Sequence, residues 1–559
     1  MTKFSLLFLF LIWLIPHLRA TELEDAPQEV KNIYIFGKIW GFLKYYHPKV
    51  KSGNYNWDNE FQKQFDNVRS ATNTDQFNQI ISEWISSLGK VKGCKTKAKK
   101  KNYFDKNFEL AWIDDTTIIR SDVRSVLKNI YDHRGKKQFY VEYGRSYQAV
   151  PINESLNDAF DYQSTSHRFN AMFMFWNFVE YFYPYKYLMD NSWDNSLLES
   201  IPRLLESDTP IAFHSAMLQL SSNIDDSHGL YHNTIVRDLF GEKYIAGIFS
   251  IIEDQVVITG YYNDSLAQID DIKRGDIVTH IDGISVDDII EKRSEFIPYS
   301  NDTWKSRPYS VFNGATEEVV VTVIRSGEKL NKTYHRYHFD DLKFLPHKID
   351  AEVCHKRIEN RVICEVHGNN IGYIRLHSID KNEVDSLMNK IKSTKGLILD
   401  LRGHNIDNFI DKLLPYFQSE KTAFAQVTRP DLSCPGRFIY QEPETCGGKS
   451  KSFVYSNKVV VLTNSGTLSS SEFLCMALQT APNVTIIGSQ TAGADGNISK
   501  FDFVEKTLIK LSGKGVYYPD GRATQRIGIK PDIEVESTVD SITKEQDLQL
   551  ETAIEFLLK

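Results

Sequence analysis

The spacing of apolar residues divides the chain into three kinds of region. Over residues 21–240, aromatic and aliphatic residues recur at helical spacing. From Lys243 onward β-branched residues dominate, and 256–259 and 319–324 are predicted strands. From Asn369 onward short apolar runs alternate with helical patterns, with predicted strands at 371–376, 396–401, 459–462 and 485–488 and predicted helices at 381–391 and 409–418. This order predicts an α/β multidomain protein whose last part is a layered α/β unit.

The helical region contains a repeat. Four positions of the first copy recur in the second at a constant offset of 136 residues (176 − 40): Trp40, Pro48, Trp57 and Asp58 return as Trp176, Pro184, Trp193 and Asp194. Each copy is predicted to hold a helix that ends before the proline and a later helix, at 75–88 and 211–224. The aromatic residues are interpreted as core. The copies differ at their ends, where the second has the polar string DDSHG (225–229) and the first has GKVK.

A glycine-rich string marks the β region. Residues 272–283 read IKRGDIVTHIDG, in which one turn enters an apolar strand and an Asp-Gly turn leaves it. This string resembles the signature of PDZ domains. The resemblance implies binding of chain ends by strand addition, through a loop that contains Ile245, Gly247, Ile248 and Phe249. The alternative is an ordinary β-hairpin without a ligand.

The segment 459–473, VVVLTNSGTLSSSEF, places three consecutive serines, 469–471, between a predicted strand and a predicted helix at 472–481. A hydroxyl at such a turn lies where free backbone N–H groups and the positive helix end stabilise a developing oxyanion. Serine at a helix start is also a common N-cap. On this segment alone the capping interpretation is favoured, so the rest of the chain has to decide.

Four strings in the last part together resemble peptidase family S41, the carboxyl-terminal-processing and tricorn-like proteases. They are LDLR (399–402), TLSSSE (467–472), IGSQTAG (487–493) and GIKPD (528–532). The resemblance implies a ClpP/crotonase-like α/β catalytic core and cleavage of unstructured peptides, often near their carboxyl ends. It also implies Ser469 as the nucleophile, with the amides of Ser470 and Gly403 as oxyanion donors. The chain departs from the family at the second donor, where 404–407 read HNID in place of a glycine pair.

A second departure concerns the base. Processing proteases of this family carry a lysine in a Gly-Lys-Gly string, but 493–496 read GADG here. Tricorn-like members use a histidine that follows a serine in an upstream helical segment, and Ser227-His228 matches that pattern. The resemblance therefore implies His228 as general base, oriented by Ser227. The family glutamate is replaced by Gln525, which orients without charge, and Asp225 or Asp226 is a candidate for the missing charge.

Composition restricts the other possibilities. The 559 residues carry a net charge of −7, which argues against nucleic acid as a partner. The lysine-rich run 90–101 is interpreted as a solvated linker. Lys3 followed by an apolar run to Pro16 predicts a cleaved signal peptide and export, with an uncleaved anchor as the alternative. No later segment is apolar and long enough to predict a transmembrane helix.

The six cysteines suit an exported chain. The pairs Cys354/Cys364 and Cys434/Cys446 each flank a short polar stretch and are compatible with a disulfide, although spacing alone does not establish connectivity. Cys475 is predicted to be a buried thiol. No spacing resembles a zinc site, and neither a metal nor a cofactor is expected.

The predicted organisation is a signal peptide (1–20), a first helical repeat with a linker (21–150), a second repeat with the Ser-His motif (151–240), a PDZ-like domain (241–345) and an S41-like core (346–559). The predicted function is an exported serine peptidase acting on peptide or protein substrates by their C-termini. The alternative is a non-catalytic peptide-binding protein on the same scaffold, suggested by the altered turn at 404–407 and by Gln525.

Overall fold

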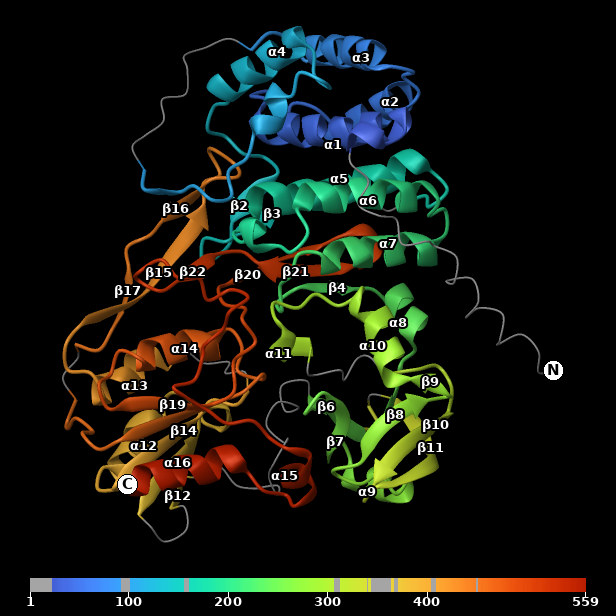
Figure 1. Cartoon of the computed structure of the whole chain (residues 1–559). Coiled ribbons are helices and arrows are strands. Elements are labelled where there is room, and N and C mark those ends of the chain that lie inside the picture. The colour runs from blue at the N-terminus through green and yellow to red at the C-terminus, as the bar shows by residue number, and fades with distance from the viewer. Residues whose placement is uncertain are drawn as a thin grey trace.

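A computed structural model describes residues 23–91, 101–154, 160–305, 312–338, 340–342, 363–365, 370–403, 409–448 and 451–559. Helices stack at one end of the molecule, and two sheet-containing lobes lie side by side at the other (Figure 1). The predicted signal peptide, the turn at 404–407 and most of the lysine-rich run fall outside the described residues.

The helical region repeats a three-helix unit, which contains the two helices predicted for each copy and, between them, a third that was not predicted. The first unit has α1 (Gln28–Tyr46), α2 (Trp57–Arg69) and α3 (Thr74–Ser87), followed by α4 (Ser121–Asp132). The second has α5 (Thr165–Phe182), α6 (Trp193–Leu205) and α7 (Pro210–Ser222). The short strands β2 (Val141–Tyr143) and β3 (Ala149–Pro151) lie between them. Asn56, Asn73, Ser192 and Thr209 cap the helices that follow them with side-chain oxygens.

Equivalent tryptophans make the same contact in both units. The indole rings of Trp40 and Trp57 stack at 6.3 Å, and those of Trp176 and Trp193 stack at 6.2 Å. In each unit the indole N–H of the second tryptophan donates to the carbonyl of the first, at 3.3 Å from Trp57 and at 3.0 Å from Trp193. The repeat in the sequence is therefore a repeat of packing, and its aromatic residues are core, as predicted.

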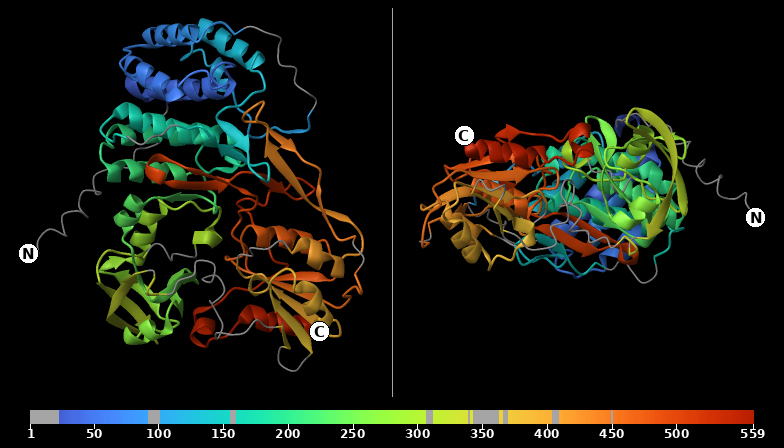
Figure 2. Two further views of the ribbon diagram at one scale, coloured as in Figure 1. Left: turned by 180° about the vertical axis from the view of Figure 1, so that it is seen from behind. Right: turned by 90° about the horizontal axis from the view of Figure 1, so that it is seen from below.

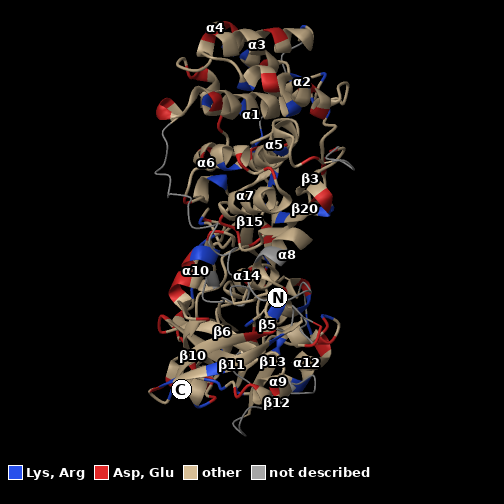
Figure 3. Ribbon diagram, turned by 90° about the vertical axis from the view of Figure 1, so that its right-hand side faces the viewer, with Lys and Arg blue, Asp and Glu red and all other residues tan. Residues whose placement is uncertain are grey.

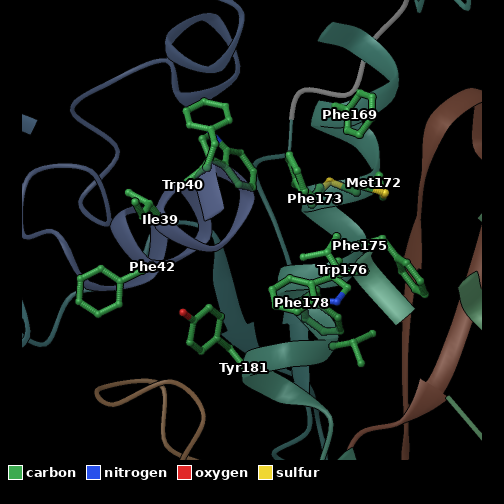
Figure 4. Close-up of a cluster of buried hydrophobic side chains, with 14 of the residues drawn as sticks. Ile39, Trp40, Phe42, Phe169, Met172, Phe173, Phe175, Trp176, Phe178 and Tyr181 are labelled. Atoms are coloured by element: carbon green, nitrogen blue, oxygen red, sulfur yellow. The ribbon is translucent and has the colours of Figure 1, made fainter. Parts of the chain in front are cut away.

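Helices α1 and α5 approach each other closely because α1 carries glycine at the contact. A Cβ on Gly37 would lie 2.1 Å from the ring of Phe173, and one on Gly41 would lie 1.7 Å from Asn177 Oδ1. The buried Asn177 amide donates to the carbonyls of Gly37 at 3.1 Å and of Phe173 at 2.9 Å. Figure 4 shows the side chains of α1, such as Trp40, facing those of α5, such as Phe173.

Strands from the end of the chain complete the helical core. β20 (Ile498–Asp502) and β21 (Leu508–Ser512) form a hairpin, and β21 also pairs with β4 (Leu230–His232), which follows α7. The ring of Phe501 packs 5.0 Å from that of Phe178 on α5. The hairpin runs beneath α5 and α6, as seen from the front in Figure 1 and from behind in Figure 2. Residues almost 300 positions apart are thus fixed next to each other at the end of α7.

The middle region forms a sheet with strand order β5-β11-β10-β8-β7-β6 and with β9 paired to β8. Its elements are β5 (Lys243–Ile245), β6 (Gly247–Ile252), β7 (Gln255–Tyr261), α9 (Asp264–Ile269), β8 (Ile277–Ile281), β9 (Ile284–Ser285), α10 (Val286–Ser294), α11 (Asp302–Lys305), β10 (Glu318–Arg325) and β11 (Glu328–His338). The two predicted strands are present as β7 and β10. Between α7 and this sheet lies the short helix α8 (Thr234–Phe240).

The last region contains a six-stranded sheet of order β12-β13-β14-β18-β19-β23, parallel from β13 onward. The strands are β12 (Ile363–Glu365), β13 (Ile371–Arg375), β14 (Gly396–Asp400), β18 (Val459–Thr463), β19 (Val484–Gly488) and β23 (Ile533–Glu534). α12 (Val384–Ile391), α13 (Ile410–Leu413) and α14 (Ser470–Leu478) contribute to the core on one face, and α16 (Leu548–Leu558) to that on the other. α15 (Val539–Thr543) precedes α16.

The predicted helix at 409–418 is shorter than expected. α13 ends at Leu413, and a 3₁₀ turn follows over Leu414–Tyr416. Pro415 has no N–H to donate and its ring clashes with the preceding turn, so the α-helix does not continue. The other predicted strands and helices of this region are present, with boundaries that differ by up to three residues.

An outlying sheet connects the two ends of the molecule and separates two cysteines. It consists of β15 (Thr422–Pro430), β16 (Phe438–Tyr440), β17 (Glu444–Cys446), β22 (Gly515–Tyr517) and β1 (Tyr103–Phe104). Cys446 pairs with the start of β15, whereas Cys434 follows the end of that strand. At the rise of a β-strand, the two ends of β15 are about 26 Å apart. A disulfide requires Cα atoms within about 7 Å. The suggested Cys434–Cys446 bond is therefore wrong, and both thiols are buried and free, as is Cys475.

Among the described residues, no helix is long and apolar enough to cross a membrane. Basic and acidic residues are intermixed along the ribbon in Figure 3. The suggested pair Cys354/Cys364 includes a residue outside the described part of the chain.

Replacing Gly41 by alanine tests the close contact between the repeats. The new methyl group would overlap Asn177, which is buried and hydrogen-bonded, so we expect the helical region to lose about 1–3 kcal/mol of stability. Urea unfolding followed by tryptophan fluorescence measures the loss. Gln62→Ala on the exposed face of α2 is the control and should leave the midpoint unchanged. Equal midpoints for the two variants would contradict a tight α1–α5 contact.

Candidate functional site

Ser469 lies between β18 and α14 in an unusual backbone conformation. It is the residue before the first turn of α14, with φ 58° and ψ −116°. An ordinary N-cap has an extended conformation, and a non-glycine residue in this region costs about 1–3 kcal/mol. The side chain is partly exposed. Ser469 thus occupies the position of a helix cap, but in the strained geometry that is found at nucleophile turns.

The carboxylate of Glu472 holds this turn. It accepts the backbone N–H groups of Ser469 at 3.0 Å, Gly493 at 2.8 Å and Ala494 at 3.1 Å, and the hydroxyl of Thr491. Burial raises the pKa of Glu472 to about 7, although the four donors favour its ionised form. The acidic residue of the serine string therefore binds the serine turn to the segment 491–494.

Asp400 and Arg402 hold the neighbouring turn. Arg402 donates to both Asp400 oxygens, with the shortest contact at 2.7 Å, and reaches Asp547 at 2.8 Å. Burial alone would raise the pKa of Asp400, but the Arg402 charge and the hydrogen bonds outweigh it and hold that pKa well below its usual range. The network is buried at the carboxyl end of β14, directly before Gly403.

Hydroxyl groups tie the two turns together. Ser471 donates to the carbonyl of Gly403 at 2.8 Å, and Thr467 donates to the carbonyl of Leu401 at 2.8 Å. β14 and β18 are parallel neighbours, so their carboxyl ends share an edge of the sheet. The predicted oxyanion donors, Ser470 and Gly403, therefore lie on adjoining turns. Ser471 is fully buried and its hydroxyl is committed, whereas Ser469 is partly exposed.

The segment 491–495 connects the serine turn to the Ser-His motif. The carbonyl of Ala494 accepts the Ser469 amide at 3.0 Å, and the carbonyl of Ala492 accepts the Ser227 hydroxyl at 3.2 Å. The Cα atoms of these two alanines are at most about 7 Å apart, since the alanines are two positions apart in the chain. The structure thus attaches Ser469 and Ser227 to neighbouring points of one segment.

Ser227 also pairs with Ser300, in the segment between α10 and α11. Each serine hydroxyl accepts the backbone N–H of the other, both at 2.9 Å. The described contacts of the Ser227 hydroxyl therefore anchor the backbone beside His228.

The His228 ring has a hydrogen-bond partner on β21. Its Nδ1 lies 2.9 Å from Ser512 Oγ, and Ser512 in turn donates to Asp226 at 3.1 Å. The His228 side chain is 9% exposed. Pairing of β4 with β21 brings the end of the hairpin to this ring.

Gln525 is buried beside the same acid. Its Nε2 donates to Asp226 at 3.1 Å and to Ser300 at 3.3 Å. Asp225, by contrast, faces Arg526 at 3.1 Å. Of the two candidate acids, Asp226 is the one that the structure places in contact with both Gln525 and Ser512.

The predicted peptide-binding residues lie at the edge of the middle sheet. Gly247, Ile248 and Phe249 begin β6, the terminal strand of its sheet path, and Ile245 ends β5. Their side chains are buried, and Phe249 packs against Phe312 at 5.1 Å. What this edge offers a peptide is backbone rather than side chains. Its role in binding stays a prediction.

Sequence reasoning missed Ser512 and Ser300. Ser512 ends an alternating strand and Ser300 lies in a polar loop, so neither belongs to a recognisable motif. Each acquires its place through a contact between distant segments. Within the described residues, no group of three or more His, Cys, Asp or Glu side chains is arranged to hold a metal ion.

Asp400→Asn tests the support of the Gly403 turn. Removing one charge leaves Arg402 buried without its main partner, which typically costs about 3–5 kcal/mol. We expect a lower thermal midpoint together with weaker reactivity of Ser469. Asp520→Asn breaks an exposed Arg–Asp pair of the same i,i+2 spacing and serves as the control, with no change expected. Wild-type stability in Asp400→Asn would exclude this network as the support.

Comparison with known proteins was made for the whole chain. Residues 370–535 match the model of peptidase family S41. A carboxyl-terminal-processing protease of Synechocystis sp. is 30% identical over 201 residues, which cover 34% of this chain and 44% of that protein. A carboxy-terminal-processing protease of Bartonella bacilliformis is 27% identical over 237 residues, which cover 40% of this chain and 51% of that protein. The chain thus covers about half the length of these relatives.

Among solved structures, the crystal structure of mature CPAF matches with a TM-score of 0.55 at 13% identity. The match covers 72% of this chain and 97% of that one. It extends the similarity of fold beyond the matched family region. Residues 370–535, which carry the motifs at one edge of the sheet, are thus the part of the chain that is similar to peptidase family S41.

Proposed function

We propose that this chain is a serine peptidase in which Ser469 is the nucleophile and His228 the general base. The observation that carries the proposal is Ser469 itself. It is a partly exposed serine at positive φ, at the carboxyl edge of a parallel sheet and at the start of a helix. Of the three serines 469–471, Ser469 is the one at positive φ, and the hydroxyl of Ser471 is committed to the Gly403 carbonyl.

The reaction follows from these assignments. Ser469 Oγ attacks the scissile carbonyl carbon while its proton passes to His228. Because Nδ1 of His228 is bonded to Ser512, the nitrogen that takes the proton is Nε2. The negative carbonyl oxygen is held by the amides of Ser470 and Gly403. When the C–N bond breaks, His228 returns the proton to the leaving amine, and water then hydrolyses the acyl-enzyme by the same sequence.

A histidine base agrees with the contacts of the string 493–496, which stands where processing proteases of the family carry a lysine. The string at 493–496 carries no lysine, and its amides at Gly493 and Ala494 are used to bind Glu472. This segment holds the turn rather than supplying a base. The base comes instead from the end of the second helical repeat, which the Ser227 hydroxyl fastens to Ala492.

The proposed substrates are unstructured peptides and protein C-termini. Two relatives are named carboxyl-terminal-processing proteases, and the middle domain presents the PDZ-like edge strand β6. An extended peptide adding to this edge would be bound through its backbone, with its end in the loop before Gly247. The proposal includes an exported location, which the leader-like sequence at 1–20 supports.

Labelling with a serine-directed fluorophosphonate tests the chemistry without knowledge of the natural substrate. We expect wild type to be labelled at Ser469, Ser469→Ala not to be labelled, and His228→Ala to react about 10²–10⁴-fold more slowly because the hydroxyl keeps its proton. Labelling rates and mass spectrometry of the modified peptide measure this. Ser465→Ala, in the same turn, is the matched control and should react as wild type does.

The same variants separate the enzyme from the binding-protein alternative. Cleavage of an unfolded protein such as reduced casein should disappear in Ser469→Ala while the thermal midpoint stays within a few degrees of wild type. Absence of labelling in folded wild type, with retained binding of C-terminal peptides, would favour the non-catalytic alternative.

A further inference from the structure

We propose that Asp226 is the acid that positions His228 and stabilises the positive charge of its protonated ring, and that it acts through the hydroxyl of Ser512. This inference rests on the proposed role of His228 as base. It assigns to Asp226 and Ser512 the part that a glutamate at position 525 has in the tricorn-like pattern. Neither residue contacts the reacting atoms, so both are positioning residues.

The hydrogen-bond directions define the relay. Ser512 Oγ donates its proton to Asp226 Oδ1 at 3.1 Å, so towards His228 it acts as an acceptor. Nδ1 of His228 must then carry the proton that bridges the 2.9 Å to Ser512. This tautomer leaves the Nε2 lone pair for the Ser469 proton. When Nε2 is protonated, the positive ring lies next to the hydroxyl dipole, and its Nδ1 is 4.0 Å from Asp226 Oδ1.

Asp226 is held by four donors. Its Oδ1 accepts the Ser512 hydroxyl, the His228 backbone N–H at 3.0 Å and the Gln525 amide at 3.1 Å, and its Oδ2 accepts the Ser512 backbone N–H at 2.7 Å. The side chain is fully buried. A carboxylate is an acceptor at all of its lone pairs only when ionised, so this surrounding suits a negative charge. The same contacts fix Asp226 relative to both His228 and β21.

Gln525 fits this site because it is neutral. Its amide donates to Asp226 and to Ser300. A glutamate there would lack that donor and would bring a second carboxylate within about 3 Å of Asp226, where two like charges do not both ionise readily. In this chain a glutamine thus fits position 525, because the acid stands at position 226.

Two other charged groups near this corner, Arg526 and Glu472, have partners elsewhere. Arg526 bonds to Asp225 at 3.1 Å and to Asp190 at 2.6 Å. Glu472 binds the segment 491–494. The acid that the structure places beside the ring of His228 is therefore Asp226, while β21 contributes the neutral Ser512 and the loop before α11 contributes the neutral Ser300.

The pH dependence of fluorophosphonate labelling on the full chain tests this relay. A nearby anion stabilises the protonated imidazole, so removing it lets His228 lose its proton at lower pH. We expect the acid limb of the rate–pH profile of Asp226→Asn to move down by about one pH unit, with a slower maximum rate. Ser512→Ala should lower the maximum rate about tenfold or more but shift the limb less, because Asp226 remains.

Three further variants complete the test. Ser512→Thr keeps the hydroxyl and should stay within a few-fold of wild type. Ser499→Ala removes a buried hydroxyl of the same hairpin that bonds to Ala149, and should leave the profile unchanged. Gln525→Glu should react more slowly than wild type. A faster Gln525→Glu, or an unshifted acid limb in folded Asp226→Asn, would overturn the relay.

Failure of the relay and failure of the proposed function give different results. If wild type is not labelled at Ser469, the peptidase assignment falls and the relay falls with it. If wild type is labelled and His228→Ala is slow, but Asp226→Asn and Ser512→Ala keep the wild-type rate and profile, the peptidase assignment stands and the relay alone is wrong. Thermal midpoints of all variants exclude unfolding as the cause of lost labelling.

Discussion

The buried carboxylate of Glu472 is the interaction on which the site depends. It accepts backbone N–H groups from the serine turn and from residues 493 and 494. These two segments follow different strands, β18 and β19, and a hydrogen-bonded carboxylate between them sets their separation. The strained conformation of Ser469 persists because the surrounding contacts over-determine it. Without this anchor, neither the hydroxyl nor the segment that binds Ser227 has a defined position.

The second constraint is that the site is assembled from distant parts of the chain. The serine turn belongs to the α/β layer, His228 follows the last helix of the second repeat, and Ser300 comes from the loop between α10 and α11. The β20–β21 hairpin links them, since it packs under the helices and pairs with β4. Folding of the helical repeats is thus a condition for a complete site. The close α1–α5 packing is part of that fold, although it lies far from the proposed site.

The two departures from the family pattern have related physical explanations. The lysine-free string uses its amides to hold the serine turn, and the proposed base, His228, belongs to the helical region. Asp226 lies two residues before His228, and Ser512 of the hairpin bridges its carboxylate and the ring. Glutamine at position 525 agrees with the proposed base, because its neutral amide donates to a carboxylate that a glutamate would repel.

The sequence by itself determined the elements and the motifs. The offset of 136 residues predicted the second helical unit, since repeated core positions require repeated packing. Apolar periodicity predicted the strands of the α/β layer, and the strings around 400 and 469 implied that Gly403 and Ser470 lie beside Ser469. These are local properties, or consequences of the rule that parallel strands share a carboxyl edge.

Only the tertiary structure decided the contacts between distant segments. The choice of Asp226 over Asp225, the presence of Ser512 and Ser300, and the separation of Cys434 from Cys446 all depend on how strands and loops far apart in sequence come together. No periodicity encodes such contacts, because each partner looks like an ordinary strand or loop residue. Hydrogen bonds across the assembled fold give Ser512 its place beside His228.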